Sequence, residues 1–142
     1  IWLGDYVPEW NDHVTGTLAL ERGLEPRTGK DAILEDIGQL TTYDALDDDF
    51  VQINQMLKYF KLGFGKASEQ ASGFIHAGLM TREEAIERIK GIDGQCADRY
   101  VRRFCNFIGI SKEEFWEVAN SFRNPEIWEK CGKGWRHKYP LD

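Results

Sequence analysis

The spacing of apolar side chains along this sequence predicts helices. Residues 49–62 carry them every three or four positions, the period of one helix face, at Phe50, Ile53, Leu57 and Phe60. Comparable runs, several of them closed by a glycine, predict helices over residues 12–22, 66–77, 97–108 and 111–122, and one that begins at Thr81. No stretch of any length alternates apolar and polar positions as a half-buried strand does. We therefore expect an all-α fold, a small irregular bundle of about six helices.

Two of these helices begin with a strong local signal. Thr81-Arg82-Glu83-Glu84 and Ser111-Lys112-Glu113-Glu114 both fit the capping box, in which a hydroxyl and a glutamate satisfy free N–H groups at a helix start. The periodicity also predicts which side chains of the last two helices are buried. In the 97–108 helix these are Val101, Phe104, Cys105 and Ile108, and after Ser111 they are Phe115, Val118, Ala119 and Phe122.

Residues 25–48 lack a clear helical period. They contain Pro26, Gly29 and Gly38 and an excess of acidic side chains, so we interpret them as an irregular acidic loop with one helical turn at most. A loop of this length in a small domain is a candidate binding or lid segment. The chain is thus expected to divide into residues 1–48 (an extended opening segment, the first helix and the acidic loop) and residues 49–142, a helical domain.

The end of the chain carries weaker signals. Pro125 predicts a short helical turn through Trp128, because proline favours the first position of a helix. The tail that follows, from Gly132 to Asp142, is basic and aromatic, and we expect it to lie over the surface.

Composition and charge exclude several classes of protein. The 142 residues include 18 basic and 24 acidic side chains, a net charge of −6, without a stripe of Lys and Arg that nucleic acid would require. No apolar run approaches the length of a membrane-spanning helix. Cys96, Cys105 and Cys131 are odd in number and form no C-x-x-C, so we expect reduced thiols in a cytoplasmic protein. With no signal-peptide pattern after Ile1, we also expect a domain of a longer protein whose remaining part precedes it.

The candidate chemistry lies between two predicted helices. Gly63 and Gly65 allow the backbone to approach a ligand closely, and the helix that follows offers free N–H groups to a phosphate or carboxylate. Lys66 adds charge and Ser68 a hydroxyl, although the pattern is not a Walker A loop. Two glycines between helices also make a tight structural corner, and the bare pattern favours that alternative.

Metal chemistry has little support in the sequence. The Asp47-Asp48-Asp49 run could bind Mg²⁺, but a helix start with acids at its positive end is the simpler interpretation. His13, His76 and His137 are isolated, without the spacing of metal ligands, so we expect no metal site in this chain.

Several segments together resemble a known family. They are Tyr59-Phe60-Lys61-Leu62-Gly63-Phe64-Gly65-Lys66-Ala67-Ser68-Glu69-Gln70-Ala71-Ser72, then Gly78-Leu79-Met80-Thr81-Arg82-Glu83-Glu84-Ala85, Asp93-Gly94, and the Ser111–Val118 segment. They are similar to the C-terminal region of N-acetyl sugar amidotransferases, enzymes of lipopolysaccharide O-antigen and nonulosonic acid biosynthesis that resemble PP-loop ATP pyrophosphatases. The resemblance covers most of the chain and is poorest over residues 25–48 and after Trp128.

The resemblance implies an activity and its partners. The carbonyl of an N-acetylated sugar, nucleotide-linked or free, would be activated by adenylylation with ATP and Mg²⁺, and ammonia from a partner glutaminase would give an acetamidino group. Gly63, Gly65, Lys66 and Ser68 would line the substrate or nucleotide side of the site, with Arg82 as a further candidate. The chain would be the C-terminal helical part of a larger α/β enzyme.

Two departures from the family pattern limit this expectation. The Ser-Gly-Gly-x-Asp-Ser phosphate loop and the paired cysteines of the family are absent from these residues, so we expect this part alone to be inactive. Lys66 stands where the family pattern has Arg, which keeps the charge and loses the bidentate fork. The alternative is a non-enzymatic helical adaptor whose aromatic surface binds a partner protein.

Overall fold

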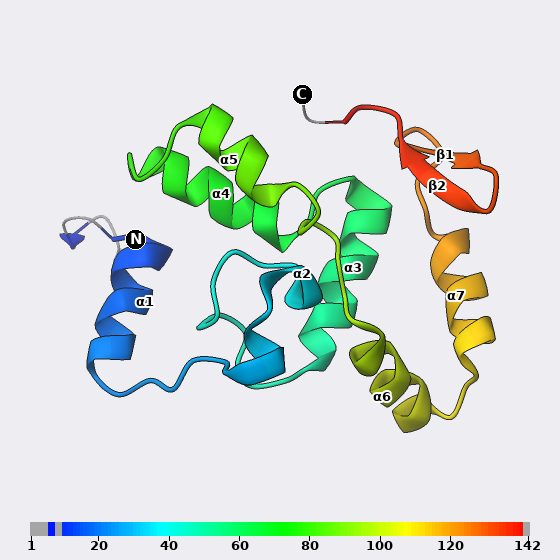
Figure 1. Cartoon of the computed structure of the whole chain (residues 1–142), viewed down its shortest axis with the longest axis horizontal. Helices are drawn as coiled ribbons and strands as arrows, with labels where there is room; N and C mark the ends of the chain where they lie inside the picture. The colour runs from blue at the N-terminus through cyan, green and yellow to red at the C-terminus, as the bar shows by residue number, and fades with distance from the viewer. Residues whose placement is uncertain (1–5, 8–9, 141–142) are drawn as a thin grey trace.

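The chain folds into helices followed by one small hairpin. In the computed structural model, which describes residues 6–7 and 10–140, the helices are α1 (Asp12–Glu21), η2 (a 3-10 turn, Gly29–Ala32), α2 (Leu34–Ile37), α3 (Phe50–Leu62), α4 (Lys66–His76), α5 (Arg82–Ile89), α6 (Asp98–Ile108) and α7 (Lys112–Ser121). Strands β1 (Trp128–Cys131) and β2 (Gly134–His137) follow, with α1 and the hairpin at opposite ends of the molecule (Figure 1). The prediction of a mainly helical bundle is confirmed.

Two clusters of buried side chains form the core. The larger one joins α2, α3, α6 and α7 through residues such as Ile37, Ile53, Val101 and Phe115. The smaller one lies between α4 and α5, where the small side chains of Ala67, Ala71 and Ala85 let the two helices approach closely.

The segment after α2 connects the two clusters. Ile37 belongs to the larger cluster and Leu40 to the smaller one, and all of residues 37–41 are buried. The amide of Gln39 donates to Gln52 of α3, and the Leu40 N–H donates to the side chain of Gln70 in α4. The prediction of a lid is therefore wrong for these five residues, because they are part of the core.

Of the two predicted capping boxes, the one at Thr81 is confirmed completely, and the one at Ser111 is confirmed for its hydroxyl bond. Thr81 and Glu84 form the complete capping box, with bonds of 3.2 Å to the Thr81 hydroxyl and 2.7 Å to the Glu84 carboxylate. At the start of α7 the Ser111 hydroxyl accepts from the Glu114 N–H at 3.0 Å. Ahead of α3, Asp48 accepts from the Phe50 N–H at 2.8 Å, which agrees with the helix-start interpretation of the acidic run.

The predicted buried faces are partly wrong. Phe115 and Ala119 of α7 are buried, but Val118 and Phe122 are 51% and 65% exposed, as is 45% of Ile108 in α6. Conversely, Gln52 is fully buried, because it pairs with Gln39 inside the core. Periodicity identified the helices correctly, whereas the width of each buried stripe depends on the neighbouring helices.

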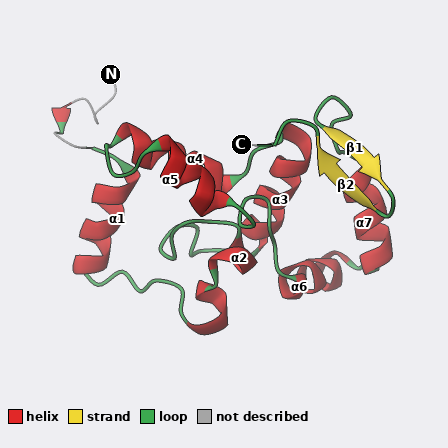
Figure 2. Cartoon of the chain, turned by 45° about the horizontal axis from the view of Figure 1, so that its top comes forward, coloured by secondary structure: helices red, strands yellow, loops and turns green. Residues whose placement is uncertain are grey.

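The predicted turn at Pro125 is present, since the N–H groups of Ile127 and Trp128 donate to the Asn124 carbonyl at 3.0 and 2.9 Å, but the chain then forms a hairpin that the sequence did not predict. Trp128 pairs with His137 and Lys130 with Trp135 in antiparallel register (Figure 2). Gly132, with a φ of 59°, provides the positive φ that a two-residue hairpin turn requires. The hairpin is held to the helices by Arg123, whose guanidinium lies 3.4 Å from the ring centre of Phe60 and over Trp128 and Trp135.

Candidate functional site

A cleft of about 690 Å³ opens between the end of α3, the paired helices α4 and α5, and the hairpin with the residues after it. Its apolar walls include Phe64, Ile75, Ile86 and Ile127. The polar and aromatic side chains that face it are Tyr59, Ser68, Ser72, Arg82, Lys90, Asp93, Gln95, His137 and Tyr139. We call this space the cleft. Three of the five predicted site residues, Gly63, Ser68 and Arg82, line it.

Gly63 forms the corner between α3 and the cleft. It ends α3 with a φ of 80°, a left-handed conformation that glycine adopts without strain. A Cβ at this position would lie 2.8 Å from Cγ2 of Ile127 and 2.9 Å from Nε2 of His137. The absence of a side chain therefore allows the hairpin end to pack against the end of α3.

Gly65 allows an aspartate to cap α4. The backbone N–H of Gly65 donates to Oδ2 of Asp93 at 2.9 Å, and the N–H of Ser68 donates to Oδ1 at 3.2 Å. The Ser68 hydroxyl also donates to Oδ2 at 2.6 Å. A Cβ on Gly65 would lie 2.6 Å from Oδ1 of Asp93, so a larger residue would displace the carboxylate. The start of α4, which the sequence suggests as a site for an external anion, is thus occupied by the carboxylate of Asp93, 28 residues after Gly65.

Asp93 is the site residue for which sequence reasoning gave no role. Its neighbour Gly94, with a φ of 74°, lies against the ring of Tyr59. Burial raises the pKa of the Tyr59 hydroxyl, and the nearby Asp93 carboxylate raises it further, while Arg123 opposes the change. The only signal in the sequence was the Asp93-Gly94 pair, which by itself resembles an ordinary turn.

Aromatic stacking orients the histidine of the cleft. The rings of Tyr59 and His137 both contact the Trp128 ring edge to face, with centroids at 5.2 and 4.9 Å. The Nδ1 atom of His137 accepts from the Tyr139 N–H at 3.0 Å. In the neutral ring the proton therefore lies on Nε2, the atom that faces Gly63.

Arg82 provides charge at another end of the cleft. It is the first residue of α5 and is exposed, and it has no ion pair within residues 6–7 and 10–140. Lys90, beyond the last residue of α5, pairs with Glu87. Arg82 is therefore the cation of the cleft wall that has no ion-pair partner among the described residues, whereas Lys90 has an exposed one.

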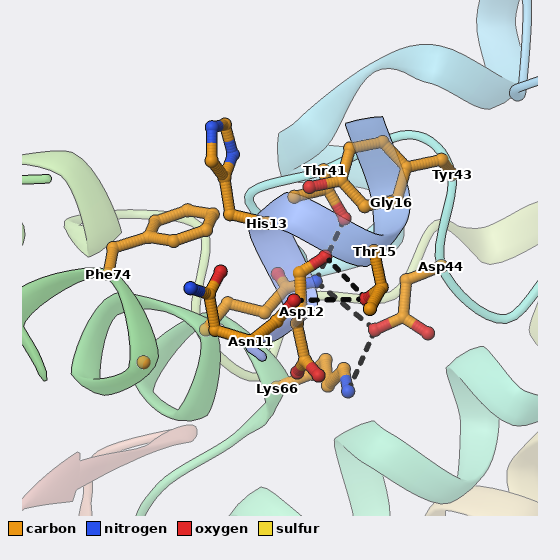
Figure 3. A pocket seen from close by; sticks show the side chains of 12 residues that line it. Asn11, Asp12, His13, Thr15, Gly16, Thr41, Tyr43, Asp44, Lys66 and Phe74 are labelled. Atoms are coloured by element: carbon orange, nitrogen blue, oxygen red, sulfur yellow. Dashed lines mark hydrogen bonds and ion pairs between the residues drawn. The ribbon is translucent and has the colours of Figure 1, made fainter. Parts of the chain in front are cut away.

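Lys66 lies in a different cavity. Its Nζ pairs with Asp44 at 2.8 Å inside a space of about 420 Å³ between α1, residues 41–44 and α4, which we call the α1-side cavity (Figure 3). The side-chain amide of Gln70 donates to both Thr41 and Asp44 in the same cavity. The rings of His13 and Phe74, which also line it, meet edge to face at 5.8 Å. Lys66 and Ser68 are two positions apart on α4, so they point to different sides of the helix. The structure therefore separates two residues that the sequence placed together.

The described residues form no cluster of three or more side chains suited to a metal ion. Of the acidic run at 47–49, Asp49 pairs with Arg27 and Arg103, and Asp48 accepts from the Phe50 N–H at the start of α3. Two of the three carboxylates that could have bound Mg²⁺ thus have structural partners.

These features define a small helical domain with a ligand-sized cleft between two packed helices and a hairpin. The family described as "LPS biosynthesis protein WbpG-like, C-terminal domain" matches residues 37–139, and the chain belongs to this family. No curated protein matches the chain. All residues named above as lining the cleft lie inside the matched range, whereas five residues of the α1-side cavity lie outside it: Asn11, Asp12, His13, Thr15 and Gly16.

Family membership places the domain among proteins of lipopolysaccharide biosynthesis. Within the part of the chain that the structure describes, every helix is too short or too polar to cross a bilayer.

Proposed function

We propose that this domain belongs to an ATP-dependent sugar amidotransferase, and that its cleft binds the N-acetylated sugar. The enzyme would convert the N-acetyl group of a surface-polysaccharide sugar to an acetamidino group, with ammonia from a partner glutaminase. The observation that carries the proposal is the cleft itself, which lies in the matched range and gathers Gly63, Ser68 and Arg82. Its volume is within the range of small-molecule sites.

The walls of the cleft suit a sugar. The exposed ring of Phe64, with Tyr59 and Tyr139, offers flat apolar surfaces to the C–H faces of a pyranose. Asp93 and Ser68 offer acceptors and donors to hydroxyl or amide groups. A mainly apolar wall with a few fixed polar groups is the usual composition of a specific small-molecule site.

The described residues do not fit the phosphates of ATP. The free N–H groups expected at the start of α4 are bonded to Asp93, and no cluster suited to Mg²⁺ occurs in the described ranges. We therefore assign to this domain the binding and orientation of the sugar, and we derive no step of the ATP chemistry from its residues.

The proposal is tested with the full-length protein. Incubation with ATP, Mg²⁺, ammonium and UDP-N-acetylglucosamine should yield AMP, pyrophosphate and a sugar nucleotide in which mass spectrometry detects NH in place of oxygen. Arg82→Gln should lower the turnover, whereas Arg102→Gln, an exposed arginine of α6, should leave it unchanged. Absence of AMP formation with every N-acetylated sugar nucleotide tried would contradict the proposal.

The adaptor function remains the second candidate because apolar side chains are exposed on α6 and α7. Phe107 and Phe122 are 74% and 65% exposed, and Ile108 and Val118 accompany them. Exposed apolar residues of this kind often mark a protein interface. If the adaptor function is correct, Phe107→Ser and Phe122→Ser should abolish binding of the glutaminase subunit, and titration of the cleft with sugars should give no heat.

A further inference from the structure

The two ends of α5 give the cleft opposite charges. Arg82 begins the helix, and Ile89 ends it about 10 Å further along at 1.5 Å per residue. Asp93 remains at that second end, because its N–H donates to the Ile89 carbonyl at 3.2 Å. A ligand that lies along α5 therefore meets a cation at one end and a carboxylate at the other.

The carboxylate end is closed to anions. Asp93 accepts three hydrogen bonds, from the N–H groups of Gly65 and Ser68 and from the Ser68 hydroxyl. These bonds hold its negative charge at the start of α4, where a phosphate would otherwise bind. A phosphate at this position would meet a fixed like charge, so the start of α4 rejects it.

The same carboxylate can still accept a hydrogen bond. A carboxylate has about four lone-pair positions, and three accept from Gly65 and Ser68, which leaves one on Oδ1. No cation pairs with Asp93 in the described parts of the chain, and Tyr59 and Gln95 are its neighbours along the cleft wall. The group that fits here is an uncharged donor, such as a sugar hydroxyl or an acetamido N–H.

We propose that the cleft binds a phosphorylated sugar in one orientation, with the uncharged ring at Asp93 and the phosphate at Arg82. This inference rests on the proposed function, since it takes the cleft as the sugar site. It adds which residue binds the sugar ring and which binds the phosphate. Asp93 is a specificity-determining residue in this arrangement, because it accepts from the ring and excludes phosphate from the start of α4. Lys90 also lines the cleft near this end, in an exposed ion pair with Glu87, whereas the Asp93 carboxylate is fixed in place by three hydrogen bonds.

The test titrates the ¹⁵N-labelled 142-residue chain with N-acetylglucosamine and with N-acetylglucosamine 1-phosphate, followed by NMR and calorimetry. Both sugars should shift the amides of Ser68 and Gly94, and only the phosphorylated sugar should shift the amide of Arg82. The phosphate should also tighten binding, and this gain should shrink as salt is added.

Two variants separate the two ends of the cleft. Arg82→Gln should reduce the affinity for the phosphorylated sugar to that for the neutral one, and leave the neutral sugar unaffected. Asp93→Asn should lower the affinity for both sugars by about tenfold or more, which is the usual contribution of a hydrogen bond to a charged group. Arg102→Gln and Asp98→Asn, which make the same charge changes on α6, should alter neither affinity.

Specific results would overturn the inference. If Asp93→Asn binds N-acetylglucosamine 1-phosphate more tightly than the wild type does, the phosphate lies at the start of α4. If Arg82→Gln lowers the affinity for both sugars equally, Arg82 does not bind the phosphate. If neither sugar shifts the amides of the cleft in the wild-type chain, the inference is also refuted. This result does not depend on whether a variant folds. If the full-length enzyme turns over but these amide shifts and affinity changes are absent, the proposed function stands and this inference is false. If the shifts and affinity changes occur but no N-acetylated sugar nucleotide is turned over, the polarity of the cleft stands and the proposed function is false.

Discussion

Gly91 and Gly94 allow a sharp test of the packing behind the cleft. Both lie in the connection between α5 and α6 with nearly the same left-handed backbone, at φ of 72° and 74°. A Cβ added to Gly91 would meet nothing within 4 Å, whereas one added to Gly94 would lie 2.0 Å from Cδ1 of Tyr59. Substitution by alanine at each position therefore introduces the same backbone strain and differs only in crowding.

The magnitudes follow from these two contributions. A non-glycine residue in the left-handed region costs about 1–2 kcal/mol, which is the whole loss expected for Gly91→Ala. Forcing a methyl group into a filled site adds roughly 1–3 kcal/mol, so Gly94→Ala should lose about 2–5 kcal/mol. Because the same residue type is changed in both, the effect on the unfolded chain cancels in the comparison.

The assay is urea unfolding followed by circular dichroism, with equal slopes required for the two variants. In a Tyr59→Ala background the additional cost of Gly94→Ala should disappear, since the ring that it strikes is gone. Equal losses for Gly91→Ala and Gly94→Ala, or an additional cost that persists without the Tyr59 ring, would refute the packing described here.

Three further predictions concern other contacts. Asp93→Ala should lower the free energy of unfolding by about 1–3 kcal/mol through the loss of the α4 cap, and sulfate should stabilise the variant more than it stabilises the wild type, because only the variant has an open anion site at the start of α4. An unchanged melting curve would contradict the capping role. Burial raises the pKa of the Cys96 thiol to about 12, so a thiol reagent at neutral pH should label exposed Cys131 rapidly and half-buried Cys96 much more slowly. Equal labelling rates for the two thiols in the folded protein would be inconsistent with the fold. Burial acts to raise the pKa of Asp31, but hydrogen bonds from Tyr100 and Arg99 lower it below 3.8. The ionised Asp31 therefore stabilises the fold above that pH, and this stabilisation is lost as the pH falls through the lowered pKa. Asp31→Asn should remove this pH dependence from the free energy of unfolding, and an identical pH profile for the two proteins would count against the interaction.

The sequence determined the helices because their signals are local. Periodic apolar side chains, the Thr81 and Ser111 caps and the glycines that end α3 and α6 act within one or two turns, so they are legible without the fold. The sequence does not predict the hairpin because β1 and β2 are four residues each, which is too short for the alternation of β2 to stand out, and Trp128 is their one buried residue. The same limit applies to Gln52, whose burial depends on a partner 13 residues away.

The candidate site depended on contacts that no local pattern contains. The Gly63–Ser68 segment was recognised as special, and the structure places Gly63 and Ser68 at the cleft. However, the partner of the α4 start is Asp93, and the partner of Lys66 is Asp44 on the other side of the helix. Pairings across 20 to 30 residues are selected by how α4 packs on α5 and on the 37–44 segment. The sequence by itself therefore determined the helices and singled out the Gly63–Ser68 segment, and only the tertiary structure decided which side chains meet there, because those contacts join residues that are far apart in the chain.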